Sequence, residues 1–256
     1  MKKSILNRFG RMINMPLNRI GLSLVRTGQS VKDSMPTWKE RMELAKQIGF
    51  SPRFIFDGGA FKGLWTQETA RLFPGAEIVL IEPNSYVLES IKKNISHIQP
   101  TPTIINAALG ELKGKAKLNI WREAESDTGA SLLSHVSGNA ANVIEVDVET
   151  IDNISERTAI VPDLVKLDLQ GGELAALKGA TKVLKHAEFV VVEFGCLEAY
   201  IGRTTPHDLI DLMYANNYCL YDIVDCHYRP YDNALTGGDF FFVKNDSVLR
   251  EYKGWD

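Results

Sequence analysis

The stretch FIFDGGAFKGLWT, residues 54–66, decides the fold of this chain. It begins with an apolar run, continues through a turn that holds Gly58, Gly59 and Gly63, and ends where a helical pattern starts. A strand, a glycine-rich turn and a helix start form a nucleotide-binding corner, because small residues let backbone N–H groups approach a ligand. This signal is weak by itself, so the remaining chain has to identify the ligand.

Short apolar runs alternate with helical stretches from Phe54 onward, which is typical of βαβ units and a parallel sheet. Two later runs, YCLYDIVD and DFFFVK, suit an antiparallel hairpin at a sheet edge. The pattern therefore predicts an α/β fold with seven strands. The predicted strands are 53–57, 77–81, 103–107, 164–170, 188–194, 218–225 and 239–244, and the predicted helices are 37–48, 63–73, 84–95, 173–185 and 205–217.

Two more segments, 116–121 and 142–148, alternate in hydropathy like half-exposed strands. They flank a loop, residues 123–142, that is rich in Ser, Gly, Asn and Asp. Such a loop either closes over a binding site or is a mobile insertion, and the sequence favours neither.

The composition suits one large folded domain, since 45% of the 256 residues are hydrophobic and 24% are charged. A net charge of −3 argues against a nucleic-acid-binding protein, whose affinity comes from phosphate contacts. Residues 1–32 differ from the rest, because they carry seven of the 29 basic residues and no acidic residue. We predict an N-terminal basic amphipathic helical segment over residues 1–50 and a main domain over residues 51–256.

The basic segment shows apolar residues at helical spacing on both sides of Pro16. It either docks on an anionic membrane surface or an acidic partner, or packs on the main domain with its basic faces in solvent. The three cysteines lack the paired spacing of a zinc site or redox pair, and no apolar run approaches the roughly 18 residues of a membrane span. We expect a cytoplasmic protein, peripheral at the inner face of the membrane if the segment docks there.

The glycine turn departs from the dinucleotide fingerprint, which needs glycines at positions 58, 60 and 63, because position 60 is Ala60. Asp57 adds a carboxylate where a pyrophosphate would lie, an arrangement of like charges that costs binding energy. The same carboxylate suits a cationic ligand. S-adenosylmethionine has an ammonium, a sulfonium and no phosphate, so we predict this cofactor, with NAD as the alternative.

Further cofactor-binding residues follow the second and third predicted strands. Glu82, in LIEPN, is placed to accept hydrogen bonds from both ribose hydroxyls of an adenosine, or is an ordinary strand-end carboxylate before a proline turn. Asn106 and Ala107 either flank the adenine or form a structural turn. The predicted cofactor site comprises Asp57, Gly58, Gly59, Ala60, Gly63, Glu82, Asn106, Ala107 and Asp168.

Seven stretches resemble the FkbM-type methyltransferases: DGGAFKG, IEPN, NAALGELKGKAKL, GASL, VETID, VKLDLQGGELAALKGA and VVEF, in the family's order. The resemblance implies a class I methyltransferase (Rossmann-like) fold, with a seven-stranded, mostly parallel sheet whose last strand is antiparallel. It also implies S-adenosylmethionine-dependent O-methylation of a hydroxyl of a glycan, a glycolipid intermediate or a related secondary metabolite. This chain departs from the family at Gln170, where an acid is usual, and at Phe61, where asparagine is frequent.

Methyl transfer to a hydroxyl needs a base or a metal that removes or polarises the hydroxyl proton. Asp168 and Glu193 end the fourth and fifth strands, where the sites of open α/β sheets lie, and Asp168 is our first candidate, with helix capping as its alternative. His227, in a predicted loop, is the third candidate or a solvent-exposed side chain. Asp168 and Glu193 with a further donor are an alternative divalent-ion site, but no strong metal spacing is present.

Two other functions remain alternatives at this point. A nucleotide-dependent sugar oxidoreductase would use the same corner, and Asp57 and Ala60 argue against it. A non-catalytic module that keeps the cofactor fold is the second, because Gln170 cannot act as a base or a strong metal ligand. Lys166 is expected to pair with an acid, and Glu173 to be favoured by the dipole of the helix that it begins.

Overall fold

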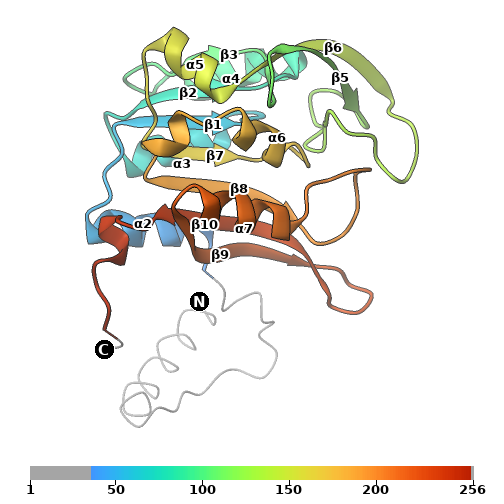
Figure 1. Cartoon of the computed structure of the whole chain (residues 1–256). Helices are drawn as coiled ribbons and strands as arrows, with labels where there is room; N and C mark the ends of the chain where they lie inside the picture. Colours follow the sequence, from blue (N-terminus) through green and yellow to red (C-terminus); the bar gives the residue numbers. More distant parts are fainter. Residues whose placement is uncertain (1–35, 255–256) are drawn as a thin grey trace, which may run out of the picture. The chain divides into compact units, whose positions relative to one another are not determined.

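The computed structural model describes residues 36–254 of the chain. Its main sheet has seven strands in the order β3-β2-β1-β7-β8-β10-β9 (Figure 1). All neighbouring strands are parallel except β10, which is antiparallel to both β8 and β9. This confirms the predicted seven-stranded sheet with its last strand antiparallel. The strands are β1 (Phe54–Gly58), β2 (Glu77–Ile81), β3 (Thr103–Ile105), β7 (Leu164–Leu167), β8 (Phe189–Gly195), β9 (Tyr218–Tyr228) and β10 (Leu235–Lys244).

The strand order reverses at β1, which pairs with β2 on one side and with β7 on the other. In open α/β sheets, ligands bind beyond the carboxyl ends of the strands at such a reversal, because the connections on its two sides run to opposite faces and leave a crevice. The glycine turn after β1 therefore lies where a binding crevice is expected.

The two half-exposed strands belong to a second, smaller sheet rather than to the main one. This sheet has the order β4-β6-β5, with β4 (Ala108–Leu109), β5 (Gly114–Ile120) and β6 (Asn142–Glu149). Leu118, Ile120 and Val146 give it a small apolar cluster of its own. Figure 1 shows β5, β6 and their long connecting loop at one end of the main sheet.

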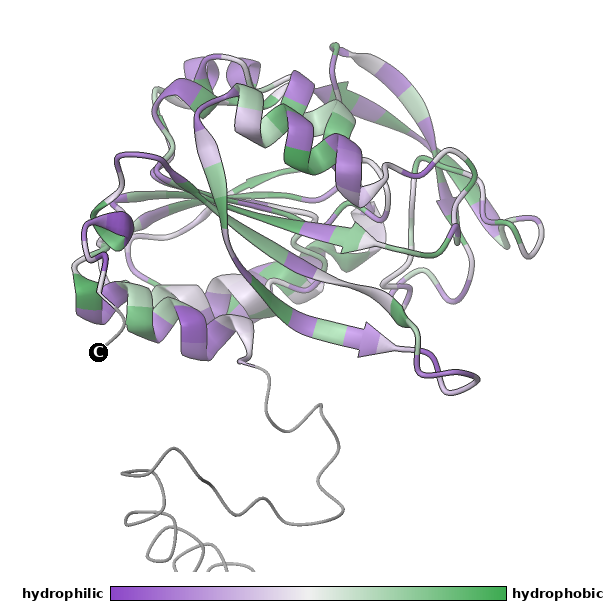
Figure 2. Ribbon diagram, turned by 60° about the horizontal axis from the view of Figure 1, so that its bottom comes forward, coloured by the Kyte–Doolittle hydropathy of each residue, from purple (hydrophilic) through white to green (hydrophobic). Residues whose placement is uncertain are grey.

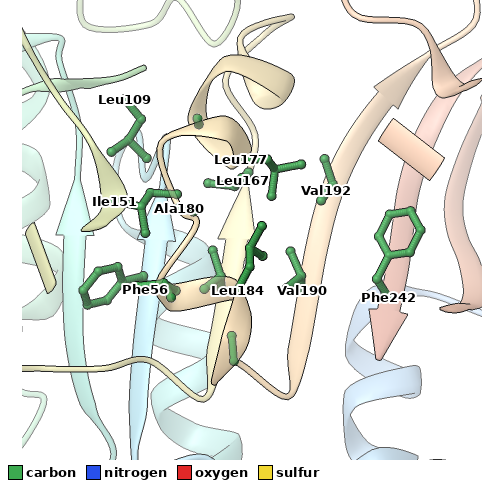
Figure 3. Packing of buried hydrophobic residues seen from close by; sticks show 14 of the residues in the cluster. Phe56, Leu109, Ile151, Leu167, Leu177, Ala180, Leu184, Val190, Val192 and Phe242 are labelled. Atoms are coloured by element: carbon green, nitrogen blue, oxygen red, sulfur yellow. The ribbon is translucent and has the colours of Figure 1, made fainter. Parts of the chain in front are cut away.

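Helices cover both faces of the main sheet (Figure 1). One core cluster combines the sheet with α2, α3 and α4, and another combines it with α5, α6 and α7. Figure 3 shows part of the second cluster, in which Phe56, Leu177 and Val190 lie between strands and helices. The bounds are α2 (Trp38–Ile48), α3 (Leu64–Leu72), α4 (Leu88–Ile95), α5 (Ile151–Thr158), α6 (Glu173–Lys178) and α7 (Pro206–Ala215), with single 3-10 turns η2 (Ser85–Val87), η3 (Val183–Lys185) and η4 (Val248–Arg250).

The apolar pattern that predicted the strands is visible in the finished fold. Figure 2 shows hydrophobic colour concentrated in the central strands and hydrophilic colour on the outer faces of the helices. Strands β7 and β8 are buried along almost their whole length, as expected for parallel strands with helices on both faces.

Two helices differ from their predictions. The predicted helix 173–185 ends at Lys178, with Gly179 as its C-cap, and η3 resumes the turn separately. A side chain at Gly179 would meet the carbonyl oxygen of Gly110 at 2.3 Å, so this position requires glycine. Helix α5 was not predicted, although Thr150 caps it with a side-chain bond from the Asn153 N–H and Ile154 is fully buried.

Helix α2 confirms the prediction for 37–48, and it begins with a capping box between Thr37 and Glu40. Its Met42 and Ala45 belong to the same buried cluster as Ile55 of β1, so this helix packs with the main domain. The predicted amphipathic helices of the basic segment lie outside the described residues, and the domain division at residue 50 stays a prediction. No helix within residues 36–254 is long and apolar enough to cross a membrane.

Candidate active site

The turn after β1 is held in a tight backbone conformation by its glycines. Gly59 and Gly63 both have φ of +72°, the left-handed region that favours glycine. A Cβ at Gly59 would lie 1.9 Å from the carbonyl oxygen of Asp168, so the turn is in close contact with the backbone that follows β7. Phe61 also has a positive φ, of 47°, which asparagine adopts more readily than phenylalanine, so this departure from the family pattern carries backbone strain.

The backbone N–H groups of this turn are used within the protein. Those of Gly59 and Ala60 donate to the carbonyl oxygen of Ile81 at 2.9 and 3.3 Å, and that of Phe61 donates to Glu82 Oε2 at 2.7 Å. A pyrophosphate site needs such groups free to face the ligand. The turn therefore supplies these three donors to the end of β2 and to Glu82 rather than to a phosphate.

Asp57 is fully buried behind the turn, and its charge is neutralised inside the protein. Its Oδ1 lies 3.4 Å from the Lys166 ammonium, and its Oδ2 accepts a 2.6 Å hydrogen bond from the Thr66 hydroxyl. This confirms the expected pairing of Lys166 with an acid. It also corrects the prediction that the Asp57 carboxylate faces a cationic ligand, and it weakens the argument that Asp57 repels a pyrophosphate.

Lys166 connects the buried Asp57 to Asp168, which lines the cavity described below. Its ammonium donates to the carbonyl oxygen of Gly59 at 3.1 Å and lies 3.6 Å from Asp168 Oδ2. Burial acts to lower the pKa of Lys166, but the carboxylates of Asp57, Asp168 and Asp239 raise it above its ordinary value. Lys166 is therefore a fixed positive charge between two carboxylates.

A cavity of about 230 Å³ opens beyond the glycine turn, at the strand ends. Glu82 lines it with only 6% of its surface exposed, and its two oxygens accept the N–H groups of Phe61 at 2.7 Å and Asn84 at 2.8 Å. Burial raises the pKa of Glu82 to about 7, although these two bonds act in the opposite direction. The carboxylate is thus rigidly held, and further hydrogen-bond donors would stabilise its ionised form.

The predicted cofactor residues divide into those that line this cavity and those that support it. Gly59, Ala60, Glu82, Ala107 and Asp168 line it. Gly58 is packed among strand residues, where a Cβ would lie 2.8 Å from Leu109, and Gly63 is the N-cap residue of α3. The Asn106 amide donates to the carbonyl oxygens of Glu82 and Pro83 at 2.8 and 3.1 Å and so fixes the end of β2.

Sequence reasoning missed much of the apolar wall of the cavity. The missed lining residues include Phe61, Leu64, Trp65, Leu109, Leu118 and Leu132. The polar loop 123–142 was the signal for another part of the lining, because Asp127, Thr128 and Ser131 of that loop line the cavity beside Leu132. Of the two interpretations of the loop, the structure supports a position over the site.

A cluster of carboxylates lies at the ends of β7, β8 and β10. Asp168 directly follows β7, Glu193 lies near the end of β8, and Asp239 of β10 is paired with Glu193 across the antiparallel ladder. Burial and the neighbouring Asp168 and Glu173 raise the pKa of Glu193 well above its ordinary value, and Arg203, at 3.2 Å, opposes this. Burial, together with Asp168, raises the pKa of Asp239 to about 7. The structure thus brings Asp168 and Glu193 together, as predicted, and adds Asp239.

Gln170 lies between the two predicted catalytic carboxylates. Its amide nitrogen donates to Asp168 Oδ1 at 2.9 Å and lies 3.3 Å from Glu193 Oε2, and its amide oxygen accepts from the Tyr200 hydroxyl at 3.1 Å. An acid at this position would place a third carboxylate against the other two. The neutral amide joins them instead, which is the physical consequence of this departure from the family pattern.

Glu173 has a structural role that its position at the start of α6 predicts. Its Oε1 accepts the N–H groups of Leu169 at 2.8 Å and Gly171 at 3.1 Å, and so closes the turn between β7 and α6. It is 1% exposed, and burial raises its pKa. Its oxygen is therefore occupied by the backbone of the turn that carries Gln170.

His227 does not lie in a loop, which corrects its predicted placement. It is an exposed residue of β9, paired with Gly237 of β10, and it is not among the residues that line the cavity. The structure therefore does not bring His227 together with Asp168 and Glu193. Among the described residues, no group of three or more His, Cys, Asp or Glu side chains is arranged to hold a metal ion.

Solved structures with a similar fold include several methyltransferases. Methyltransferase FkbM from Methylobacillus flagellatus KT is 19% identical, with a TM-score of 0.49, and the match covers 74% of this chain and 43% of that chain. A putative RNA methyltransferase from Pyrococcus horikoshii is 10% identical, with a TM-score of 0.45 and coverage of 80% and 82%. Fibrillarin from Aeropyrum pernix, solved with natively bound S-adenosyl-L-methionine, is 10% identical, with a TM-score of 0.45 and coverage of 80% and 74%.

A search of curated proteins finds no match. The model of the methyltransferase FkbM domain, in contrast, matches residues 57–223, which is more than half of the chain. This range includes the glycine turn, Glu82, Asp168 and Glu193. The chain therefore belongs to the FkbM methyltransferase family.

Proposed function

We propose that this protein is an S-adenosylmethionine-dependent O-methyltransferase that methylates a hydroxyl of a glycan, a glycolipid intermediate or a related secondary metabolite. One observation carries the proposal. Glu82 and Asp168 line the same cavity, so a carboxylate suited to an adenosine and a carboxylate suited to a reacting hydroxyl face one space. The family match supports methyl transfer, and the carboxylate at the end of β7 supports oxygen as the acceptor atom.

The cavity fits S-adenosylmethionine in its donor set and its walls. The ionised Glu82 would accept hydrogen bonds from two ribose hydroxyls, while Ala107, Leu109 and Leu118 would provide apolar surface for an adenine ring. The Asp168 side chain, 40% exposed, offers negative charge to the cationic end of the ligand. S-adenosylmethionine, when bound, would supply an electrophilic methyl group with a neutral thioether as the leaving group, so that the carbon–sulfur bond breaks as the oxygen–carbon bond forms.

Asp168 acts as the base in this proposal. Its carboxylate takes the proton of the acceptor hydroxyl as the hydroxyl oxygen attacks, which contributes roughly 10²–10⁴-fold in comparable enzymes. Lys166 at 3.6 Å and the Gln170 amide at 2.9 Å hold the carboxylate in place. Glu193 Oε2 lies 3.3 Å from the same amide nitrogen and is not among the residues that line the cavity, so it orients Gln170.

Calorimetric titration with S-adenosylmethionine and, separately, NAD tests the cofactor, and mass spectrometry of glycan acceptors incubated with the cofactor tests turnover. We expect micromolar binding of S-adenosylmethionine that Glu82→Gln weakens. Asp168→Asn should lose much more turnover than binding, while His227→Ala, the matched control outside the cavity, should keep both. Tighter binding of NAD, or unchanged turnover in Asp168→Asn, would contradict the proposal.

We also propose that the protein works at the cytoplasmic face of a membrane, to which the basic residues 1–32 attach it. The support is the charge of this segment, with seven basic and no acidic residues, since anionic lipids attract such segments. Sedimentation with vesicles that contain anionic lipid, compared with neutral vesicles, tests the proposal. We expect binding to anionic vesicles that disappears when residues 1–32 are removed, and unchanged binding after removal would refute it.

A further inference from the structure

A second cavity, of about 260 Å³, lies beside the first, under the loop 123–142. Its lining includes three aromatic rings, those of Trp121, His135 and Tyr200. We propose that this cavity binds a sugar ring of the methyl acceptor, with the three rings as its apolar wall. The proposal rests on the function proposed above for its chemistry, but the binding of a sugar can be measured without methyl transfer.

The aromatic wall is built by the backbone rather than by chance contact. His135 and Tyr200 are paired in an isolated antiparallel bridge, flanked by hydrogen bonds from the Val136 N–H to Ala199 at 3.0 Å and from the Ile201 N–H to Ser134 at 2.8 Å. In this arrangement the paired residues are not hydrogen-bonded to each other, and their side chains lie close together. The ring centroids of His135 and Tyr200 are 5.2 Å apart with an edge-on geometry of 87°.

Trp121 extends this wall from the end of β5. Its ring centroid lies 5.6 Å from that of His135, and its backbone N–H donates to Asp127 Oδ2 at 2.5 Å. Asp127 Oδ1 also accepts the Gly129 N–H at 3.1 Å, so one buried carboxylate holds the backbone at both Trp121 and Gly129. A sugar ring presents C–H groups on its faces and hydroxyls at its edge, and rigid aromatic surface beside polar groups matches both.

The polar part of the lining consists mainly of hydrogen-bond donors. His135 Nδ1 accepts the backbone N–H of Ser137 at 3.0 Å, so in the neutral ring the proton is on Nε2, which is a donor. Arg122 also lines the cavity, and no ion pair is found for its guanidinium within residues 36–254. These donors suit the hydroxyl and ring oxygens of a sugar.

The second cavity is connected to the proposed base. Asp127 and Thr128 line both cavities, so a ligand in the second abuts the space that Asp168 faces. The Tyr200 hydroxyl lies 2.9 Å from the carbonyl oxygen of Gly129 and 3.1 Å from Gln170 Oε1, and the amide nitrogen of Gln170 contacts Asp168. A ring held against Tyr200 is thus one side chain away from the residue that holds the base.

Saturation-transfer NMR tests the inference with the full chain and the methyl pyranosides of glucose, galactose, mannose, rhamnose and glucuronic acid as probes. We expect at least one of them to bind. Trp121→Phe and His135→Gln should each weaken its binding about tenfold, while Tyr231→Ala, which removes an aromatic ring that is 91% exposed and outside both cavities, should not.

Circular dichroism and thermal unfolding of the same variants show whether each one is folded, and calorimetry with S-adenosylmethionine separates this inference from the proposed function. Sugar binding that needs Trp121 and His135, in a protein that does not bind the cofactor, would support the subsite and refute the methyltransferase proposal. Cofactor binding with no binding of any of the five probes, or with sugar binding that both variants leave unchanged, would overturn the subsite.

Discussion

The buried pair of Asp57 and Lys166 leads to a prediction about stability that does not follow from the fold alone. Lys166→Met removes the ammonium that lies 3.4 Å from Asp57 Oδ1 and leaves a fully buried carboxylate with only the Thr66 hydroxyl as partner. At this distance and an effective dielectric constant of about 20, the lost attraction is about 5 kcal/mol. Breaking a buried pair by removing one partner costs about 3–5 kcal/mol in measured cases. We therefore expect Lys166→Met to lower the free energy of unfolding by about 3–5 kcal/mol.

Urea denaturation at equilibrium, arranged as a double-mutant cycle with Asp57→Asn, measures this effect. The double variant should be more stable than Lys166→Met alone, because no uncompensated charge remains in it. The control is Lys39→Met, which breaks the exposed pair of Lys39 with Glu68 and should cost less than about 1 kcal/mol. A cost for Lys166→Met as small as that of the control, or two single effects that simply add, would refute the view that Lys166 neutralises Asp57.

Three other substitutions test the site. Glu82→Gln should weaken S-adenosylmethionine binding about tenfold or more. The affinity of the natural protein should fall as the pH drops below about 7, because the pKa of Glu82 is about 7 and its ionised form accepts the ribose hydroxyls. Calorimetry at several pH values checks this, and an affinity that does not change with pH would contradict it. Gly59→Ala should destabilise far more than Gly75→Ala in urea denaturation, since both glycines have positive φ but only Gly59 would clash; equal costs would show that the contact with Asp168 yields easily. Gln170→Glu should lower the free energy of unfolding more at neutral than at acidic pH. The pKa of the new carboxyl should be raised in the folded protein, so the folded protein loses stability as the pH rises above the unfolded pKa of about 4.5. Gln170→Met should show no such pH dependence.

The features that depend on local patterns were predictable from the sequence. The apolar runs gave the strands of the main sheet, because a buried parallel strand is apolar along its length. The positions of Glu82 and Asp168 followed from the rule that sites lie at the carboxyl ends of strands, and both residues line the cavity. The capping box of Thr37 and Glu40 is also a local pattern, since its two side chains are three residues apart.

The features that depend on contacts between distant segments were not predictable. Nothing near Asp57 in the sequence shows that Lys166 neutralises it, since the parallel pairing of β1 and β7 creates that contact. Asp239 joins the carboxylate cluster only because the register of β10 sets it opposite Glu193. The period of two in β5 and β6 predicted strands but could not show that they form a separate sheet.

The close approach of Gly59 to Asp168 has a mechanical consequence. Because only a hydrogen fits between the glycine turn and the carbonyl oxygen of Asp168, the two loops cannot slide past each other independently. In the proposed function, a cofactor that contacts the turn therefore also acts on the backbone of Asp168. Packed main chain thus positions the backbone of Asp168 relative to the glycine turn, while the side chains of Lys166 and Gln170 hold its carboxylate.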